Sequence, residues 1–469
     1  MVFSSIPFVF FFLPVFLLLY YLAPGRIKNA VLLVFSLLFY AWGEPKYILL
    51  MLISTLVDYL DGIFLGLLHA HPTARKFCLG TALLINLGLL AFFKYADFAV
   101  GIWNALTPWD AKLPGIALPI GISFYTFQTV SYSIDVYREN IQPEKNYFSY
   151  LTYVSMFPQL IAGPIVRFST VQKELHERKI TESGFVLGAR RFLLGLMRKI
   201  LIADQLGELW ELLRHAPGIS ALTAWLGLLC FTLQLYYDFS AYSDMAIGLG
   251  RMLGFHFPEN FIYPLSATSV TDFWRRWHIS LSTWFRDYVY IPLGGNRVSV
   301  PKHLRNLFAV WFLTGLWHGA SWNFVIWGLY HGIFLVLEKY VWGKKLEKLP
   351  AVLKHLYAIV IVVVGFGIFT FDDLHELAAY FPKLICMDGN AFAGSELLWY
   401  AGNYLPFLLA ALLLAFPVYP ALTKRLETVQ PYRRKLIAFC AYAAMTALFL
   451  LAVAAMVGDS YSPFLYFRF

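Results

Sequence analysis

The sequence predicts an all-α protein that crosses a membrane many times, and three observations support this fold class. The 469 residues are 59% hydrophobic and 18% aromatic. Only 14% are charged, whereas a typical soluble domain has about 25%. The apolar residues form long unbroken runs, while an outer-membrane barrel would show alternating strands of about ten residues. These features exclude a disordered or fibrous chain and argue strongly against a soluble enzyme.

The first apolar run covers residues 8–22, close to the amino terminus. Neither Lys nor Arg precedes it and no small-residue cleavage site follows it, so we interpret it as a retained span and not as a signal peptide. A span needs about 20 mostly apolar residues. Further candidate spans lie at 30–43, 47–68, 77–99, 116–136, 186–213, 220–248, 305–320, 322–342, 356–371, 403–421 and 436–457.

Two other stretches do not look like simple crossings. Residues 147–165 are apolar but broken by Pro158, Gly163 and Pro164, and residues 277–293 are aromatic, carry charges and end at Pro292-Leu293-Gly294-Gly295. We predict re-entrant or in-plane helices there, because irregular backbone at membrane depth must be buried in protein or line a wet cavity. The sequence therefore predicts about 11 or 12 transmembrane helices plus these broken helices. We expect one membrane domain over residues 1–469, with the polar motifs concentrated in about 232–332.

The charged residues predict the orientation. Basic residues outnumber acidic ones in 166–199 and in 251–305, whereas 372–402 contains five acidic residues and only one Lys or Arg, Lys383. Basic loops stay in the cytoplasm. Residues 372–402 should therefore face outward, and twelve crossings would place both termini outside.

Cysteine and charge patterns exclude several other functions. The four cysteines form no CxxC pair, which argues against a disulfide framework and a zinc site. The formal charge of +9 is explained by basic cytoplasmic loops, and no basic stripe with exposed aromatics indicates nucleic-acid binding. Phosphate-binding P-loop, HExxH and GxSxG motifs are absent from the sequence. We expect no metal site.

His318 is the most informative polar residue in the chain. It lies between apolar stretches and is flanked by Gly315, Gly319 and Ala320, which would let another group approach closely. Polar groups at membrane depth are costly, so each is a functional candidate. His278 lies in an earlier aromatic block and could face the same cavity. The alternative for His318 is a structural histidine bonded between two helices, which is also our interpretation of His331.

Other polar residues leave two interpretations open. Asp238 and Asp244 either line a cavity or pair with Arg251. Arg275, Arg276 and Arg286 are either cytoplasmic anchors or ligands for the phosphates of a substrate.

Four motifs together resemble those of membrane-bound O-acyltransferases. They are Met156-Phe157-Pro158-Gln159-Leu160-Ile161-Ala162-Gly163-Pro164-Ile165, Tyr236-Tyr237-Asp238-Phe239-Ser240, Trp274-Arg275-Arg276-Trp277-His278 and Leu316-Trp317-His318-Gly319. The resemblance runs nearly end to end. The opening, residues 292–297 and the tail 461–467 are most similar to the bacterial alginate-acetylating branch, and the branch that transfers D-alanyl groups to teichoic acid is more distant.

The resemblance implies spans that ring a central funnel, with His318 and His278 as catalytic residues. We expect substrate contacts from polar motif residues, namely Asp238, Ser240, Arg275, Arg276, Trp317 and Asn323. A histidine suits this chemistry, since its unperturbed pKa of about 6.5 lets it accept the hydroxyl proton during acyl transfer.

The resemblance also implies a substrate and partners. An acetyl group from a cytoplasmic donor, acetyl-CoA, would cross a bacterial cytoplasmic membrane, with no bound cofactor. A serine-hydrolase-like extracytoplasmic acetyltransferase would then place it on a polysaccharide such as alginate. Three alternatives remain: transfer of a D-alanyl or other acyl group to a cell-wall polymer, a transporter or flippase without covalent chemistry, and a structural scaffold.

Overall fold

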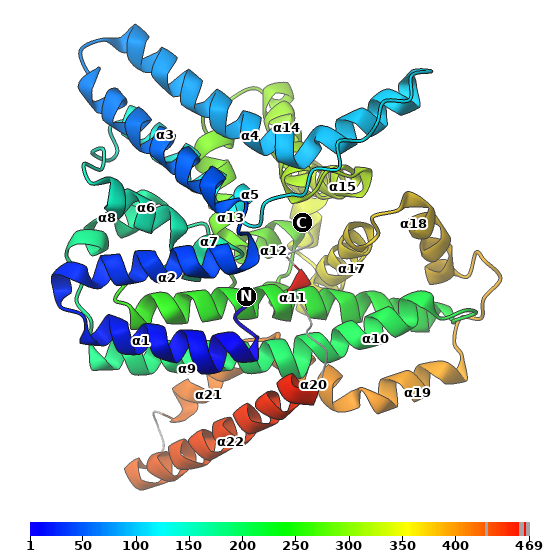
Figure 1. Ribbon diagram of the computed structural model, residues 1–469. Coiled ribbons are helices and arrows are strands. Elements are labelled where there is room, and N and C mark those ends of the chain that lie inside the picture. The colour runs from blue at the N-terminus through cyan, green and yellow to red at the C-terminus, as the bar shows by residue number, and fades with distance from the viewer. Residues whose placement is uncertain (427–429, 459–463, 466–469) are drawn as a thin grey trace. The chain divides into compact units, whose positions relative to one another are not determined.

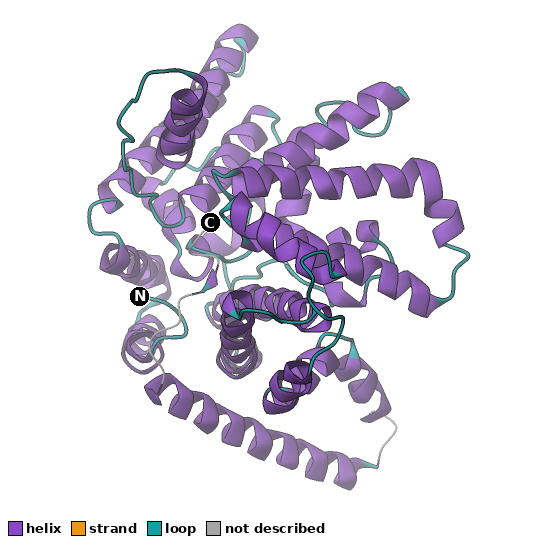
Figure 2. Ribbon diagram, turned by 90° about the vertical axis from the view of Figure 1, so that its right-hand side faces the viewer, coloured by secondary structure: helices purple, strands orange, loops and turns teal. Residues whose placement is uncertain are grey.

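The computed structural model describes residues 1–426, 430–458 and 464–465. These residues form helices joined by loops, without a β-strand in the described ranges, as Figure 2 shows. The predicted all-α fold class is therefore confirmed. Contacts between residues group the chain into two compact units. The first contains Met1–Phe192 and Ser243–Glu259, and the second contains Leu193–Tyr242 and Asn260–Leu465.

The first unit consists of the amino-terminal helices and the end of one long helix (Figure 1). A π-helical turn, Phe8–Phe12, precedes α1. The helices are α1 (Leu13–Leu22), α2 (Lys28–Gly43), α3 (Ile48–Leu67), α4 (Pro72–Leu106), α5 (Ile122–Tyr137), α6 (Tyr147–Ser155), α7 (Phe157–Leu160), α8 (Phe168–His176) and most of α9 (Glu182–Arg198).

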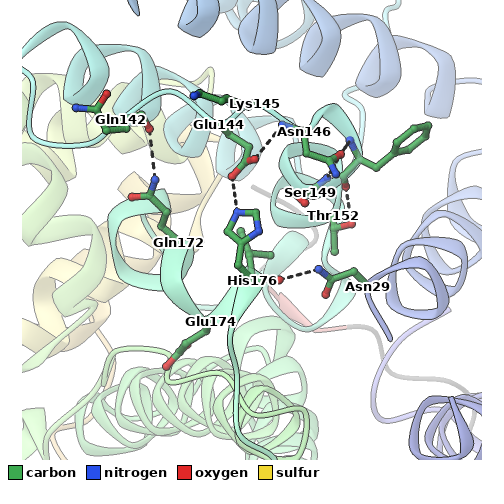
Figure 3. A network of polar contacts seen from close by, with 12 residues as sticks. Asn29, Gln142, Glu144, Lys145, Asn146, Ser149, Thr152, Gln172, Glu174 and His176 are labelled. Carbon is green, nitrogen blue, oxygen red and sulfur yellow. Dashed lines mark hydrogen bonds and ion pairs between the residues drawn. The ribbon is translucent and has the colours of Figure 1, made fainter. Parts of the chain in front are cut away.

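A polar network ties α8 to its neighbours within the first unit (Figure 3). His176 Nε2 lies 2.8 Å from Glu144 Oε2, and the Glu144 side chain is only 5% exposed. Asn146 caps α6, because its Oδ1 accepts the N–H groups of Phe148 and Ser149. The Asn29 amide donates to the Leu175 carbonyl at 2.7 Å. These bonds satisfy polar groups at helix ends that would otherwise be unpaired.

The second unit contains the block that carries the polar motifs. Its helices are α10 (Asp204–His215), the first part of α11 (Ala221–Met252), α12 (Val270–Arg276), α13 (Ile279–Phe285), α14 (Val300–His318), α15 (Trp322–Leu337), α16 (Gly343–Leu346), α17 (Ala351–Thr370), α18 (Leu374–Tyr380), α19 (Ser395–Asn403), α20 (Leu405–Leu414), α21 (Val418–Leu426) and α22 (Pro431–Gly458). Short π-helical turns follow α9, α13 and α15, at Lys199–Ala203, Arg286–Tyr290 and Glu338–Trp342.

Six helices of the described chain are long and apolar enough to cross a membrane, and a seventh candidate is the bent pair α19 and α20. The six are Gly25–Gly43, Ile48–Leu67, Pro72–Leu106, Trp322–Leu346, Ala351–Thr370 and Pro431–Gly458. The larger number of crossings and their orientation stay predictions. Helices also form at the predicted spans 116–136, 220–248 and 305–320. The first, α5, has only 16 residues, and α11 and α14 contain polar residues that lower their mean hydropathy.

The carboxyl-terminal part differs from the sequence prediction at the span 403–421, where α20 ends at Leu414 and α21 begins at Val418. The span predicted to begin at 403 is preceded by a helix that already starts at Ser395, and the two helices meet at an angle of 71°. Pro406 near the start of α20 explains the break, since proline cannot donate the hydrogen bond that would continue α19.

Of the two stretches predicted as re-entrant or in-plane helices, 147–165 is broken, whereas in 277–293 the helix α13 continues directly into a π-helical turn. Residues 147–165 form α6 and α7, separated at Met156, whose φ of −50° and ψ of 108° leave the helical region. Residues 277–293 form α13 and the π-helical turn Arg286–Tyr290. Their depth in the membrane stays a prediction.

Candidate functional site

The second unit contains a cavity of about 320 Å³ that both predicted histidines line. His278 precedes α13 and His318 ends α14, so residues forty positions apart in sequence share one space. The walls are mostly apolar and aromatic. The lining residues are Thr271, Trp274, Arg275, Trp277, His278, Leu281, Ser282, Phe285, Arg286, Tyr290, Leu307, Val310, Trp311, Thr314, His318 and Leu335.

His318 is held by aromatic rings and by the close approach of α14 and α15. Its ring lies 4.9 Å from the rings of both Trp317 and Trp327, measured between centroids. A Cβ added at Gly315 or Gly319 would collide with Phe324 of α15. The small residues noted in the sequence therefore let α15 pack directly against the end of α14. This packing places the His318 imidazole in a nearly dry site, since the residue is 6% exposed.

His278 has an unusual backbone conformation. Its φ of 44° and ψ of 55° lie in the left-handed region, at the residue that precedes the first turn of α13. Its ring packs edge-on against Phe239 at 4.8 Å and lies 6.0 Å from the Trp317 ring. His278 lies outside the apolar helices, and burial lowers the pKa of its imidazole from 6.5 to about 3. The ring is therefore neutral at physiological pH.

A polar rim surrounds the cavity next to its apolar walls. Arg275 of α12 is exposed and lines the cavity, and Arg286 of the π-helical turn lines it as well. Arg286 Nε lies 2.7 Å from Asp287 Oδ1. The Tyr290 hydroxyl lies 2.8 Å from His303 Nε2, which fixes the tyrosine ring at this rim. Two guanidinium groups at an open edge suit an anionic ligand with several phosphate oxygens.

The structure separates two arginines that the sequence treated alike. Arg275 lines the cavity, whereas Arg276 Nε donates to Asp272 Oδ1 at 2.8 Å, one helical turn away. Arg276 is not among the residues that line the cavity, and its side chain is engaged by Asp272. Substrate binding by Arg275 fits its location. Substrate binding by Arg276 stays a prediction that its location does not favour.

Asp238 lies in a buried ion-pair cluster and not among the lining residues. Lys199 Nζ is 2.7 Å from Asp238 Oδ1 and 2.5 Å from Asp204 Oδ1. The backbone N–H of Leu465 donates to Asp238 Oδ2 at 2.8 Å. This location favours a structural role for Asp238 over substrate binding, which stays a prediction.

Ion pairing of the two aspartates was anticipated, but the partner is corrected. Asp244, in the first unit, pairs with Arg191 at 2.7 Å. Asp238 pairs with Lys199. Arg251 was the wrong partner, because sequence proximity along α11 does not decide which neighbouring helix supplies the cation.

The remaining predicted substrate residues are buried and are not among the residues that line the cavity. Ser240 is 3% exposed on α11, and Trp317 packs between the two histidine rings. Asn323 is fully buried, and its Nδ2 donates to the Phe369 carbonyl in the last turn of α17. Direct substrate contact by these three residues stays a prediction.

Sequence reasoning missed three residues that shape the site. Asn260 contacts His278 at 3.1 Å, and Tyr290 and Thr314 line the cavity. Asn260 lies in a loop 18 residues before His278, so no local spacing could have revealed the contact. Within the described residues, no cluster of three or more His, Cys, Asp or Glu side chains could hold a metal ion.

Comparisons with known proteins cover this part of the chain. Residues 122–371, which include both histidines, match the family model of the membrane-bound O-acyltransferases. The chain is 44% identical to the probable alginate O-acetylase AlgI of Azotobacter vinelandii over 80% of this chain and 76% of the relative. It is 39% identical to the Pseudomonas putida protein of the same name over the full length of both. The peptidoglycan O-acetyltransferase of Helicobacter pylori is 37% identical over 72% of this chain and 70% of its own length.

Proposed function

Because this chain belongs to the membrane-bound O-acyltransferase family, it is a multi-pass membrane O-acyltransferase, and we propose that it transfers acetyl groups from cytoplasmic acetyl-CoA for O-acetylation of an extracellular polysaccharide. The observation that carries the proposal is the shared cavity of His278 and His318 with Arg275 and Arg286 at its rim. We place the protein in the bacterial cytoplasmic membrane.

The cavity fits the chemistry of acyl transfer. His318 takes the proton from the attacking hydroxyl as the new C–O bond forms and the C–S bond of the thioester breaks. The proton then passes to the leaving thiolate, so the products are an ester and free CoA. A general base typically contributes about 10²–10⁴-fold to the rate. Alignment of donor and acceptor in one cavity contributes more.

The rim supports a phosphate-bearing donor on the cytoplasmic side. Arg275 and Arg286 belong to the basic segment 251–305, which the positive-inside rule assigns to the cytoplasm. Their guanidinium groups would hold the phosphates, and the apolar walls would surround the thioester arm. CoA is then a co-substrate that leaves after each turnover, not a bound cofactor.

The names of the relatives support a polymer as the acceptor. Two of these relatives are named for acetylation of alginate and of peptidoglycan. We propose an alginate-like polysaccharide as the final acceptor, reached through a separate extracytoplasmic acetyltransferase of the serine-hydrolase type. Transfer of a D-alanyl group is the second candidate, supported by 28% identity to the teichoic acid D-alanyltransferase of Bacillus subtilis over 55% of this chain.

The test compares two buried histidines of the same unit. His318→Ala should abolish acetylation of the polymer while the protein remains in the membrane. His331→Ala is the matched control, because His331 is also buried and packs on the same Trp327, but does not line the cavity. Acetylation at the normal level in the His318 variant would refute the assignment.

A second experiment separates an enzyme from a carrier. Purified protein receives acetyl-labelled CoA together with the acceptor. Label on the acceptor supports the proposal. Movement of label across a vesicle membrane without transfer to any acceptor would show a transporter and reject acyl transfer.

A further inference from the structure

Asn260 lies directly beside His278 and holds the backbone that follows it. The residue is fully buried in the loop between α11 and α12. The N–H of Ile279 donates to the Asn260 carbonyl at 3.0 Å, and the N–H of Ile262 donates to the Arg276 carbonyl at 3.0 Å. The segments 260–262 and 276–279 therefore run side by side, and His278 lies between the two hydrogen bonds that join them.

The side chain of Asn260 determines which nitrogen of His278 carries the proton. Its Oδ1 atom lies 3.2 Å from the backbone N of Ser280 and 2.8 Å from Ser280 Oγ. A backbone N–H only donates, so the amide atom that it meets is the oxygen. The same oxygen lies 3.1 Å from His278 Nδ1, and because an amide oxygen only accepts, Nδ1 carries the hydrogen.

The consequence concerns the other ring nitrogen. In a neutral imidazole with hydrogen on Nδ1, Nε2 has the lone pair and accepts hydrogen bonds. His278 lines the cavity. The bond to Asn260 thus makes Nε2 the ring atom that can accept a hydrogen bond from a substrate.

The strained backbone points the same way. The φ of His278 is +44°, a conformation sparsely populated by residues other than glycine. Such conformations persist where the surroundings hold them, and they cluster at functional sites. The hydrogen bonds of Asn260 to Ile279 and Ser280 are the contacts that hold it here.

The surroundings of His278 are mostly apolar. Phe239 of α11 and Trp317 of α14 pack on its ring. The titratable or charged groups of the same cavity come from three elements: Arg275 of α12, Arg286 and Tyr290 of the π-helical turn, and His318 of α14. The ion-paired Asp238 lies next to Phe239 in α11.

We propose that Asn260 is a positioning residue for acyl transfer, which holds His278 as the Nδ1–H tautomer so that Nε2 accepts a hydrogen bond from the substrate. The role in catalysis rests on the proposed function, whereas the tautomer itself does not. Asn260 acts through His278 and touches neither donor nor acceptor.

Two substitutions of Asn260 separate hydrogen bonding from packing. Asn260→Leu removes the acceptor oxygen and keeps a side chain of the same branched shape. We expect kcat to fall about 10- to 100-fold, the range seen for residues that orient a metal-binding histidine. The KM for acetyl-CoA should stay near that of the unaltered protein. Asn260→Asp keeps an acceptor oxygen and should be clearly more active than Asn260→Leu. Its negative charge favours the imidazolium, so the pKa of His278 rises and the acidic limb of the kcat/KM profile moves to higher pH.

The matched control is Asn306→Leu. Asn306 is also fully buried in the second unit, but its Nδ2 donates to the carbonyls of Leu293 and Gly295 and not to a histidine. This variant should keep its kcat per folded molecule. The proposal is overturned if Asn260→Leu also keeps its kcat per folded molecule, or if Asn260→Asp has the pH profile of the unaltered protein.

A spectroscopic measurement keeps the proposal testable if the Asn260 variants do not fold. Solid-state NMR of ¹⁵N-histidine-labelled protein in lipid bilayers, with His278→Gln to assign the signal, should show a protonated Nδ1 and an unprotonated Nε2 at neutral pH. The opposite tautomer would overturn the inference. Because this readout needs no substrate, it is independent of the His318→Ala test, whose failure would reject the proposed function alone.

Discussion

The buried pair of Lys199 and Asp238 provides a quantitative test of the second unit. Lys199 Nζ lies 2.7 Å from Asp238 Oδ1, and the two side chains are only 2% and 1% exposed. Lys199→Met removes the positive charge at similar length and leaves the Asp238 carboxylate without its cation. Removing one partner of a buried ion pair costs about 3–5 kcal/mol, because the remaining charge is desolvated without compensation.

The geometry refines this magnitude. Asp238 keeps the hydrogen bond from the Leu465 N–H, and Asp204 is 20% exposed and partly reaches solvent. Both features reduce the penalty, so we expect the lower end, about 3 kcal/mol. Asp238→Asn should cost less, because Lys199 retains Asp204 and an asparagine oxygen can still accept from Leu465.

The assay is a double-mutant cycle. The free energy of unfolding of the unaltered protein, Lys199→Met, Asp238→Asn and the double variant is measured in the same detergent. The double variant should be more stable than the sum of the two single changes predicts, by at least about 1 kcal/mol, since residues in contact couple by about 0.5–3 kcal/mol. A loss below about 1 kcal/mol for Lys199→Met, or additivity of the two changes, would refute the buried-pair reasoning.

Three further predictions concern the cavity. Arg275→Gln should raise the KM for acetyl-CoA about 10-fold, which corresponds to about 1.4 kcal/mol, with little change in kcat. Arg276→Gln should leave this KM unchanged, because Arg276 pairs with Asp272. Steady-state kinetics at varied acetyl-CoA concentration distinguish the two variants. Glu338→Gln should lower the free energy of unfolding by about 1–2 kcal/mol and also raise the KM for acetyl-CoA. The Glu338 carboxylate accepts hydrogen bonds from the N–H groups of Val270 and Thr271, at the start of the helix that carries Arg275. Thermal unfolding and kinetics measure the two effects, and unchanged values would contradict the role of this cap. Finally, burial lowers the pKa of His278 from 6.5 to about 3, so between these pH values the unfolded chain binds a proton that the folded protein does not, and stability falls as pH drops below about 6.5. His278→Gln should flatten this dependence in unfolding measurements from pH 7 to 4, and an unchanged slope would contradict it.

Much of the architecture follows from local sequence. Apolar runs predicted the helices, since a membrane helix must satisfy its backbone within one segment and shows its apolar surface in consecutive residues. Pro158, Gly163 and Pro164 likewise indicated a break in 147–165, and a break is present at Met156. In 277–293 the helix continues from α13 into a π-helical turn. The bend before α20 was missed because hydropathy alone does not reveal a short helix. The helix before Tyr404 was therefore interpreted as a loop, and the helix after it as a span.

The candidate site was predictable in part. His278 and His318 stood out because polar residues are rare in apolar surroundings, and the structure brings them to one cavity. Asp238, Ser240 and Asn323 stood out for the same reason, yet they are buried and do not line the cavity. A polar residue in an apolar block needs a hydrogen-bond or ion-pair partner. Its position in the sequence does not show whether that partner is another residue of the protein or the substrate.

By itself, the sequence determined that this is a helical membrane protein and marked His278 and His318 as candidates, because composition, run length and residue chemistry are properties of the chain. Tertiary structure decided that Arg275 and not Arg276 lines the cavity, that Lys199 neutralises Asp238, and that Asn260 sets the tautomer of His278. These choices depend on distances between segments that are far apart in sequence, and only packing fixes such distances to within the length of a hydrogen bond.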